Sequence, residues 1–131
     1  FMEEDETWAV VLRSNSQLLG SFGLHRDAMR GSEIKARALG YVLAEEAWGH
    51  GYATEAAQRV LSFAFEEFGL ELVSVCHFPF NARSRRVIEK CGFRYEGTIR
   101  HAYRRYDNTV LDSCCYSIMR EEYLALKENA Q

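Results

Sequence analysis

The sequence predicts an α/β fold of the α+β kind, in which a mixed, mostly antiparallel twisted sheet carries flanking helices. The first observation behind this prediction is that strand-like and helix-like segments follow one another in the order β-β-β-α-β-α-β-β. The second is the length of 131 residues, which suffices for one domain with a real core but not for two. We therefore expect residues 1–131 to form a single domain.

The first third of the chain predicts a β-hairpin and a further strand. Residues 7–13 and 18–24 are strand-like runs, and the short polar side chains of residues 14–17 between them favour a turn. Residues 26–32 are polar and include a glycine, which indicates a loop. A third strand follows over residues 33–43, and its end is apolar enough to be buried.

A helix and a buried strand come next. From Ala53 the apolar residues recur at helical spacing, and a polar face lies opposite them. This pattern predicts a helix that begins at Gly51 and ends near Gly69, a residue type well suited to cap a helix C-terminus. Residues 70–78 then form a short apolar strand, which Pro79 ends because proline has no N–H group to donate.

The last third of the chain predicts a second helix and a long hairpin. Asn81 is a good N-cap for a helix over residues 82–91, and Gly92 stops that helix. The remaining predicted elements are strands over residues 93–106 and 109–119, a turn at residues 107–108 and a short polar helix over residues 120–128.

Composition and charge exclude several classes of protein. The net charge of −3 and the pI near 5.8 argue against a nucleic-acid-binding surface. The arginines near residues 83–86 and 100–105 are candidates for phosphate contacts, although a solvated face is favoured for most of them. There is neither a run of about 18 apolar residues nor a signal peptide, so no membrane contact is expected. The four cysteines lack a Cys-x-x-Cys spacing, which indicates reduced thiols in a cytoplasmic protein without a metal.

A glycine pair stands between the third strand and the first helix. Gly49-His50-Gly51 would leave several backbone N–H groups unpaired where the helix dipole adds partial positive charge, and that arrangement binds phosphate. Taken alone, the pair is equally typical of a simple tight turn. A dinucleotide-binding fingerprint would place Gly or Ala where this chain has Thr54, and the Gly-Lys-Ser/Thr of a P-loop is absent. The flanking sequence therefore has to decide between a phosphate-binding turn and a simple tight turn.

Four segments together carry a family resemblance. They are Gly40-Tyr41-Val42, residues 49–56, residues 81–100 and residues 116–122. In this order and spacing they resemble the GCN5-related N-acetyltransferases (GNAT), and within them the branch of the ribosomal-protein-alanine N-acetyltransferases. Those relatives begin with one more strand and a helical pair. The resemblance therefore implies a GNAT domain that is N-terminally incomplete, lacks the first strand and first helices, and leaves one sheet edge exposed.

The resemblance implies acetyl-CoA as cosubstrate, bound where the strands ending near Leu43 and Phe78 splay apart, and no metal. The pyrophosphate would lie on N–H groups of residues 49–54, and open backbone groups would pair with the pantetheine amides. Asn81 resembles the asparagine that hydrogen-bonds the pantetheine arm, a role compatible with that of an N-cap. His50 is either a basic contact or an exposed loop histidine. The predicted cofactor-binding residues are Val42, Leu43, Gly49, His50, Gly51, Tyr52, Ala53, Thr54 and Asn81.

The reaction implied by the resemblance is the attack of a neutral amine on the acetyl thioester. Many relatives support the leaving thiolate with a tyrosine seven residues after the asparagine, where this chain has Ile88. The branch it resembles uses a serine, here Ser84, whose hydroxyl would hydrogen-bond the CoA sulfur; the alternative is that Ser84 is only a first-turn helix residue. No general base is assigned. The candidates near the cleft are Glu45, Glu46, His101, Tyr103 and ordered water.

The acceptor amine stays open at this level. It is either a protein N-terminal α-amine, of the ribosomal-protein type, or a small-molecule amine such as a polyamine. The missing base favours an α-amine, since its pKa near ~8 makes it easier to deprotonate than a lysine. The acidic residues 3–6 are either the cluster that a polyamine enzyme would need or a solvated lead-in. A catalytically weak acyl-CoA-binding module is the alternative function, and either a monomer or a homodimer is compatible with the sequence.

Overall fold

The computed structural model describes residues 5–129 of the chain. Its elements in chain order are β1 (Glu6–Val11), β2 (Leu18–Arg26), β3 (Ala36–Leu43), η1 (Glu45–Ala47), α1 (Tyr52–Ser62), η2 (Phe63–Glu67), β4 (Leu72–His77), α2 (Ala82–Lys90), β5 (Arg94–Arg104), β6 (Val110–Met119) and α3 (Arg120–Asn129). Within this range no helix is both long and apolar enough to cross a membrane. Every strand and helix expected from the sequence is present, with boundaries shifted by a few residues.

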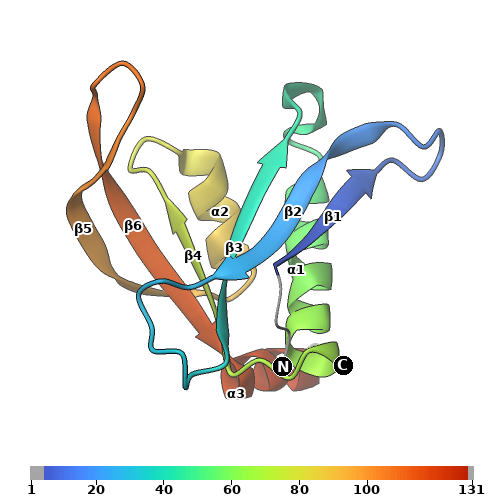
Figure 1. The fold of residues 1–131 in the computed structure, drawn as a ribbon. Coiled ribbons are helices and arrows are strands. Elements are labelled where there is room, and N and C mark those ends of the chain that lie inside the picture. Colours follow the sequence, from blue (N-terminus) through green and yellow to red (C-terminus); the bar gives the residue numbers. More distant parts are fainter. Residues whose placement is uncertain (1–4, 130–131) are drawn as a thin grey trace.

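The strands form one six-stranded sheet in the order β1-β2-β3-β4-β6-β5. All neighbours are antiparallel except β3 and β4, which run parallel because α1 carries the chain from one to the other. The predicted mixed, mostly antiparallel sheet is confirmed. Within the described residues, β1 and β5 form the two edges of the sheet (Figure 1).

The sheet opens into a fork between its two parallel strands. β3 and β4 pair only from Ala36 with Leu72 to Leu39 with Val75, and beyond that point the two strands diverge (Figure 1). The last residues of β3 stay paired with β2 on their other side. The predicted splay of these two strands is therefore present in the structure.

The pairing pattern shows which backbone groups the fork leaves open. The N–H of Ala44 donates to the carbonyl of Leu19 on β2, at 2.7 Å. Because backbone groups alternate in direction along a strand, those of Tyr41 and Leu43 face away from β2, toward β4. Beyond Leu39 no β4 residue pairs with them, although the Leu43 carbonyl accepts a bond from the Trp48 indole N–H at 3.0 Å. The N–H groups of residues 41 and 43 thus point into the fork.

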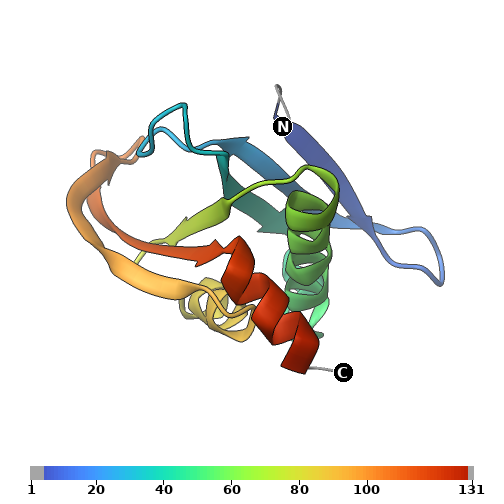
Figure 2. The same cartoon turned by 90° about the horizontal axis from the view of Figure 1, so that it is seen from below.

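Helices α1 and α2 lie on the same face of the sheet (Figure 2). Their inward side chains share one core with the strands. That core includes Phe22, Leu24, Leu39, Ala57, Val60, Leu61, Ala64, Phe65, Leu70, Val73, Val75, Ile88, Tyr116 and Ile118. Burial of this apolar side holds α1 and α2 against the sheet. Both helices begin at the fork.

The first helix departs from its prediction in one respect. It is α-helical only to Ser62 and continues as the π-helical turn η2, in which the N–H of Phe68 donates to the carbonyl of Phe63. The wider turn brings Phe63 and Phe68, five residues apart, onto the same ring of Trp8, at centroid distances of 5.8 and 6.1 Å. The helical period of 3.6 residues in the sequence does not predict this contact with a residue far away in the chain. Gly69 follows with φ of 67°, as a C-terminal glycine cap requires.

A buried carboxylate ties the loop between β2 and β3 to the rest of the sheet. Asp27 accepts bonds from the Ser74 hydroxyl at 2.8 Å, the Arg30 guanidinium at 2.7 Å and the Met29 N–H at 3.0 Å. Arg30 also holds both oxygens of Glu96 at the start of β5. Burial alone would raise the pKa of Asp27, but the bonds from Ser74, Arg30 and Met29 outweigh it and hold the pKa below its usual value.

We expect Asp27→Asn to lower the free energy of unfolding at pH 7 by about 1.5–3 kcal/mol, since it removes hydrogen bonds to a charged group. The pKa of Asp27 is lower in the folded than in the unfolded state, so its stabilisation is present above the unfolded pKa and is lost as the pH falls through the folded pKa. Urea titrations at pH 7 and at pH 3 measure this. Equal losses at both pH values would contradict the assignment. The exposed Glu89, in a 3.5 Å pair with Arg85, supplies the control Glu89→Gln, with little expected change.

Candidate active site

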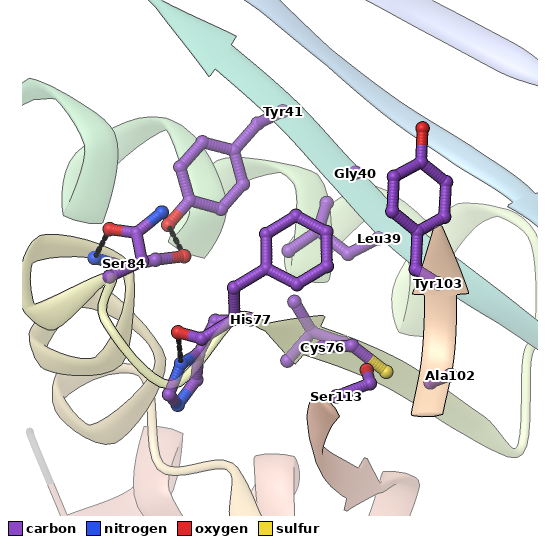
Figure 3. Close-up of a pocket in the computed structure, with 12 residues that line it drawn as sticks. Leu39, Gly40, Tyr41, Cys76, His77, Ser84, Ala102, Tyr103 and Ser113 are labelled. Atoms are coloured by element: carbon purple, nitrogen blue, oxygen red, sulfur yellow. Dashed lines mark hydrogen bonds between the residues drawn. The ribbon is translucent and has the colours of Figure 1, made fainter. Parts of the chain in front are cut away.

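Two cavities meet at the fork. The larger, about 780 Å³, lies between the start of α1 and helix α2. The smaller, about 390 Å³, lies between the diverging ends of β3 and β4 and reaches β5 and β6 (Figure 3). Tyr41, Asn81 and Ser84 line both cavities. These three residues therefore mark the place where a molecule bound in one cavity meets a molecule bound in the other.

The larger cavity contains the glycine turn. Gly49 and Gly51 both have φ of 79°, a left-handed conformation that a residue with a side chain rarely adopts. Gly51 is the N-cap of α1, and no side chain of the described residues caps this helix. The N–H groups of the first helical turn consequently lie open, at the positive end of the helix dipole. This turn offers the donor set that phosphate requires.

Most of the predicted cofactor-binding residues lie around this larger cavity. They are Val42, Leu43, Gly49, Gly51, Tyr52, Ala53, Thr54 and Asn81. His50 differs from them, because it is exposed and stacks on Tyr52 with ring centroids 5.2 Å apart, outside the cavity lining. Its alternative role as an exposed loop histidine fits this position better. These assignments to a cofactor remain predictions.

One face of α2 adds positive charge to the larger cavity, although the sequence favoured a solvated face for most of its arginines. Arg83, Arg86 and Lys90 line the larger cavity, opposite the glycine turn. Arg83 also lies over the Trp48 ring, 4.2 Å from its centroid, and so connects α2 to the segment after β3. The missed signal is the helical spacing i, i+3, i+7. The neighbouring Arg85 points elsewhere and pairs with Glu89 at 3.5 Å, as expected of a solvated arginine.

The junction of the cavities is built from hydroxyl groups. Asn81 caps α2 as predicted, since its side-chain oxygen accepts a 3.0 Å bond from the Ser84 N–H. The Ser84 hydroxyl oxygen is 2.7 Å from that of Tyr41 (Figure 3). Tyr41 is held in turn by stacking on Phe22, with centroids 4.7 Å apart. Burial raises the pKa of Tyr41, although the bond to Ser84 opposes the rise, so the phenol stays protonated at neutral pH.

The smaller cavity has an uncharged lining. Its walls are Leu39, Gly40, Tyr41, Val75, Cys76, His77, Phe78, Asn81, Ser84, Ala102, Tyr103 and Ser113. No Asp, Glu, Lys or Arg is among these described residues. Burial, together with the neighbouring Cys115 thiol 3.3 Å away, raises the pKa of Cys76 to about 11, so that this thiol is also neutral. The cavity is therefore suited to a neutral or weakly charged group.

Among the proposed base candidates only Tyr103 lines the smaller cavity, where its ring lies 5.7 Å from that of Phe78. Glu45 and Glu46 are exposed in η1 and line neither cavity. His101 is exposed in a bulge of β5, with φ of 53° and its N–H bonded to Asp112 at 3.0 Å. The described residues thus supply no carboxylate to the lining of the smaller cavity.

The fold and the site are those of an α/β protein whose sheet forks beside a glycine turn at a helix start. The glycine turn and the basic face of α2 fit phosphates, and the open N–H groups of β3 fit amide carbonyls. No group of His, Cys, Asp and Glu among residues 5–129 is arranged to hold a metal ion. Residues 2–94 match the family model of the acetyltransferase (GNAT) domain. The chain belongs to the GNAT acetyltransferase family.

Individual relatives agree with this membership. YoaA of Bacillus subtilis, named an uncharacterized N-acetyltransferase, is 31% identical over 113 residues, which cover 86% of this chain and 62% of YoaA. YdaF of the same organism, provisionally named a ribosomal N-acetyltransferase, is 34% identical over 112 residues, 83% of this chain and 57% of YdaF. A GNAT-family acetyltransferase structure from Bacillus anthracis matches 88% of this chain and 67% of its own, with a TM-score of 0.79 and 31% identity. The chain thus spans about three fifths of the length of these curated relatives.

Proposed function

We propose that the protein transfers the acetyl group of acetyl-CoA to the α-amine at the N-terminus of a polypeptide. The observation that carries the proposal is that the smaller cavity, which joins the larger one at Ser84, has no Asp, Glu, Lys or Arg among its described lining residues. Family membership implies acetyl-CoA as cosubstrate. The four cysteines are free thiols, which supports a reducing compartment such as the cytoplasm as the site of the reaction.

The larger cavity holds the cosubstrate in this proposal. The N–H groups at the start of α1 bind the pyrophosphate, and Arg86 and Lys90 neutralise the remaining phosphate charge. The open backbone groups of β3 pair with the pantetheine amides, which orients the acetyl group toward the smaller cavity. Asn81 is placed to bond the same arm with its amide N–H₂, since its oxygen already accepts from Ser84.

The catalytic step requires three contributions from the chain. The amine nitrogen attacks the carbonyl carbon, and a backbone N–H near Leu43, in the fork, stabilises the developing oxyanion. The C–S bond then breaks, its electron pair stays on sulfur, and the Ser84 hydroxyl donates a hydrogen bond to the thiolate. The surplus proton of the nitrogen leaves through ordered water, since no carboxylate lines the cavity.

The smaller cavity has no carboxylate among its described lining residues, and this favours an α-amine acceptor over a lysine or a polyamine. At pH 8 about half of an α-amine with a pKa near 8 is already neutral, against about one in 250 lysine-type amines with a pKa near 10.4. An α-amine therefore needs no strong base. A polyamine carries several ammonium groups, and burying them without carboxylate partners is unfavourable. The smaller cavity provides none among its described residues.

The N-terminal acidic cluster gives little support to a polyamine acceptor. Glu3 and Glu4 lie outside the described residues. Asp5 is exposed at the start of the β1–β2 pair, where it accepts a bond from the Arg26 N–H at 3.2 Å and lies 3.6 Å from the His25 ring. It lines neither cavity.

Thiol release from acetyl-CoA by the full-length protein tests the proposal. The panel contains a peptide with a free N-terminal alanine, the same peptide with an acetylated N-terminus and an internal lysine, and spermidine. We expect release only with the free N-terminus, and a rate that rises with pH up to about the amine pKa of 8. Turnover on spermidine alone would reject the peptide acceptor. Binding of CoA in calorimetry without turnover on any amine would support the acyl-CoA-binding module, for which the missing base is the motivation.

A further inference from the structure

We infer that Tyr41 is a positioning residue of the reaction, which donates a hydrogen bond to Ser84 and thereby directs the Ser84 hydroxyl proton at the departing CoA sulfur. This role rests on the proposed acetyl transfer and adds to it a residue that the sequence analysis did not single out. Its basis is the contact between the hydroxyl groups of Tyr41 and Ser84. Among the described residues these two, with Asn81, line both cavities.

The direction of the bond follows from acidity. The two oxygens are 2.7 Å apart, so one hydroxyl donates and the other accepts. A phenol, with a usual pKa near 10, is far more acidic than an alkyl hydroxyl and is the better donor. When Tyr41 donates, the Ser84 oxygen has accepted, and the single proton of Ser84 must point elsewhere. The open direction is the junction of the cavities, which Ser84 lines.

Both partners are held in place independently of each other. The Tyr41 ring stacks nearly parallel on Phe22, at an interplanar angle of 6°, and Tyr41 lies opposite Phe22 in the register of β2 and β3. Ser84 is fixed by its N–H bond to the N-cap Asn81 and is only 8% exposed. The bond between the hydroxyls therefore costs little further side-chain entropy. It also crosses the fork, since Tyr41 comes from β3 and Ser84 from α2 (Figure 3).

Without Tyr41, the Ser84 hydroxyl has another orientation available. A serine in the first turns of a helix readily donates to a backbone carbonyl of the preceding turn. A proton that bonds to this carbonyl is not available for a hydrogen bond to the sulfur. Tyr41 restricts the Ser84 hydroxyl because its proton occupies one side of the Ser84 oxygen, on the β3 side, which leaves fewer orientations for the Ser84 proton. The inferred role is orientation by a hydrogen bond; no proton passes from Tyr41, and atoms and charge in the acetyl transfer balance without it.

The product CoA provides a direct test that needs no acceptor. The pKa of its bound thiol is measured from the ultraviolet absorbance of the thiolate as the pH is raised, with desulfo-CoA as the reference that subtracts the four protein cysteines. A hydroxyl that donates to the thiolate lowers this pKa. We expect Ser84→Ala to abolish the lowering, and Tyr41→Phe, which keeps the stacked ring, to remove at least half of it while the Kd for CoA changes less than about threefold.

Kinetics give a second readout once an acceptor is known. We expect Tyr41→Phe to reduce kcat about tenfold with little change in the KM for acetyl-CoA, as for the loss of one oriented hydrogen bond. In the Ser84→Ala background the same change should have almost no further effect, because Tyr41 acts through Ser84. Tyr123→Phe is the matched control, since the Tyr123 hydroxyl on α3 donates to Glu66 in η2 at 2.6 Å, and neither residue lines a cavity. It should leave both measurements unchanged.

The outcomes separate this inference from the function on which it rests. If wild-type protein does not bind CoA, the proposed function itself fails. If it binds CoA and Tyr41→Phe leaves the bound thiol pKa at the wild-type value, Tyr41 does not position Ser84. Should Tyr41→Phe unfold, a nearly isosteric difluorotyrosine at position 41 keeps the test open: its more acidic phenol ionises before the CoA thiol as the pH is raised, so that it can no longer donate to Ser84. The lowering of the thiol pKa must then weaken, and an unchanged lowering overturns the inference.

Discussion

Ser84→Ala is expected to lower kcat about a hundredfold while the KM for acetyl-CoA changes little. Removing one preorganised donor aimed at developing charge typically costs on the order of 10²–10³ in kcat. The helix itself should survive, because Asn81 accepts its capping bond from the Ser84 backbone N–H, which alanine retains. Steady-state thiol release with the best acceptor of the panel measures the effect.

The control for this variant is Ser62→Ala. Ser62 also lies on a helix and donates a side-chain bond, to Glu66 at 2.9 Å, but it lines neither cavity. We expect its kcat to equal that of the wild type. A Ser84→Ala enzyme with more than half of the wild-type kcat would show that Ser84 is only a residue of the first helical turn.

Gly51→Val is expected to weaken CoA binding about a hundredfold. Gly51 has φ of 79°, which a β-branched residue avoids, although the space around its Cβ position is empty. The left-handed conformation costs about 1–2 kcal/mol in a residue with a side chain. Relaxation of the backbone would also turn N–H groups of the α1 start away from the phosphate, at about 1.5–3 kcal/mol for each charged bond. The loss of one such bond on relaxation corresponds to an affinity lower by about 10- to 150-fold, which calorimetry with CoA measures.

Gly69→Val is the control that separates a loss of CoA affinity from a loss of protein stability. Gly69 also has a left-handed φ, 67°, with nothing within 4 Å of its Cβ position, but it lies at the other end of the helical segment. Both variants should lower Tm by similar amounts, and only Gly51→Val should weaken CoA binding. Equal affinity losses in the two variants would mean that the glycine turn acts through stability and not through contact with the ligand.

The sequence predicted the elements well because their signals are local. Alternation of apolar residues, the single proline after β4 and the asparagine before α2 each act within a few residues. The long hairpin of β5 and β6 turns at Asp107-Asn108 as expected, with Asn108 at φ of 68°. The π-helical turn escaped prediction because it depends on Trp8, a residue more than fifty positions away along the chain.

The candidate site was predicted in part. The glycine turn and Asn81 were identified by the local requirements of a helix start, and Ser84 by resemblance to a family. For Arg86 a solvated face was favoured over a phosphate contact, and Lys90 was not named as a candidate, since only the approach of α2 to α1 turns a solvated helix face into a cavity wall. For His50 the sequence left two roles open, and only the structure shows that its ring stacks on Tyr52 outside the cavity lining.

By itself the sequence determined which residues form helices and strands, and where a helix begins with open N–H groups, because these properties follow from backbone conformation within a turn or two. Only the tertiary structure decided that β3 and β4 separate after four paired residues, that Tyr41 meets Ser84 across the gap, and that the smaller cavity lacks charge. These features arise between segments distant in the chain, where packing against a common core sets which side chains come together.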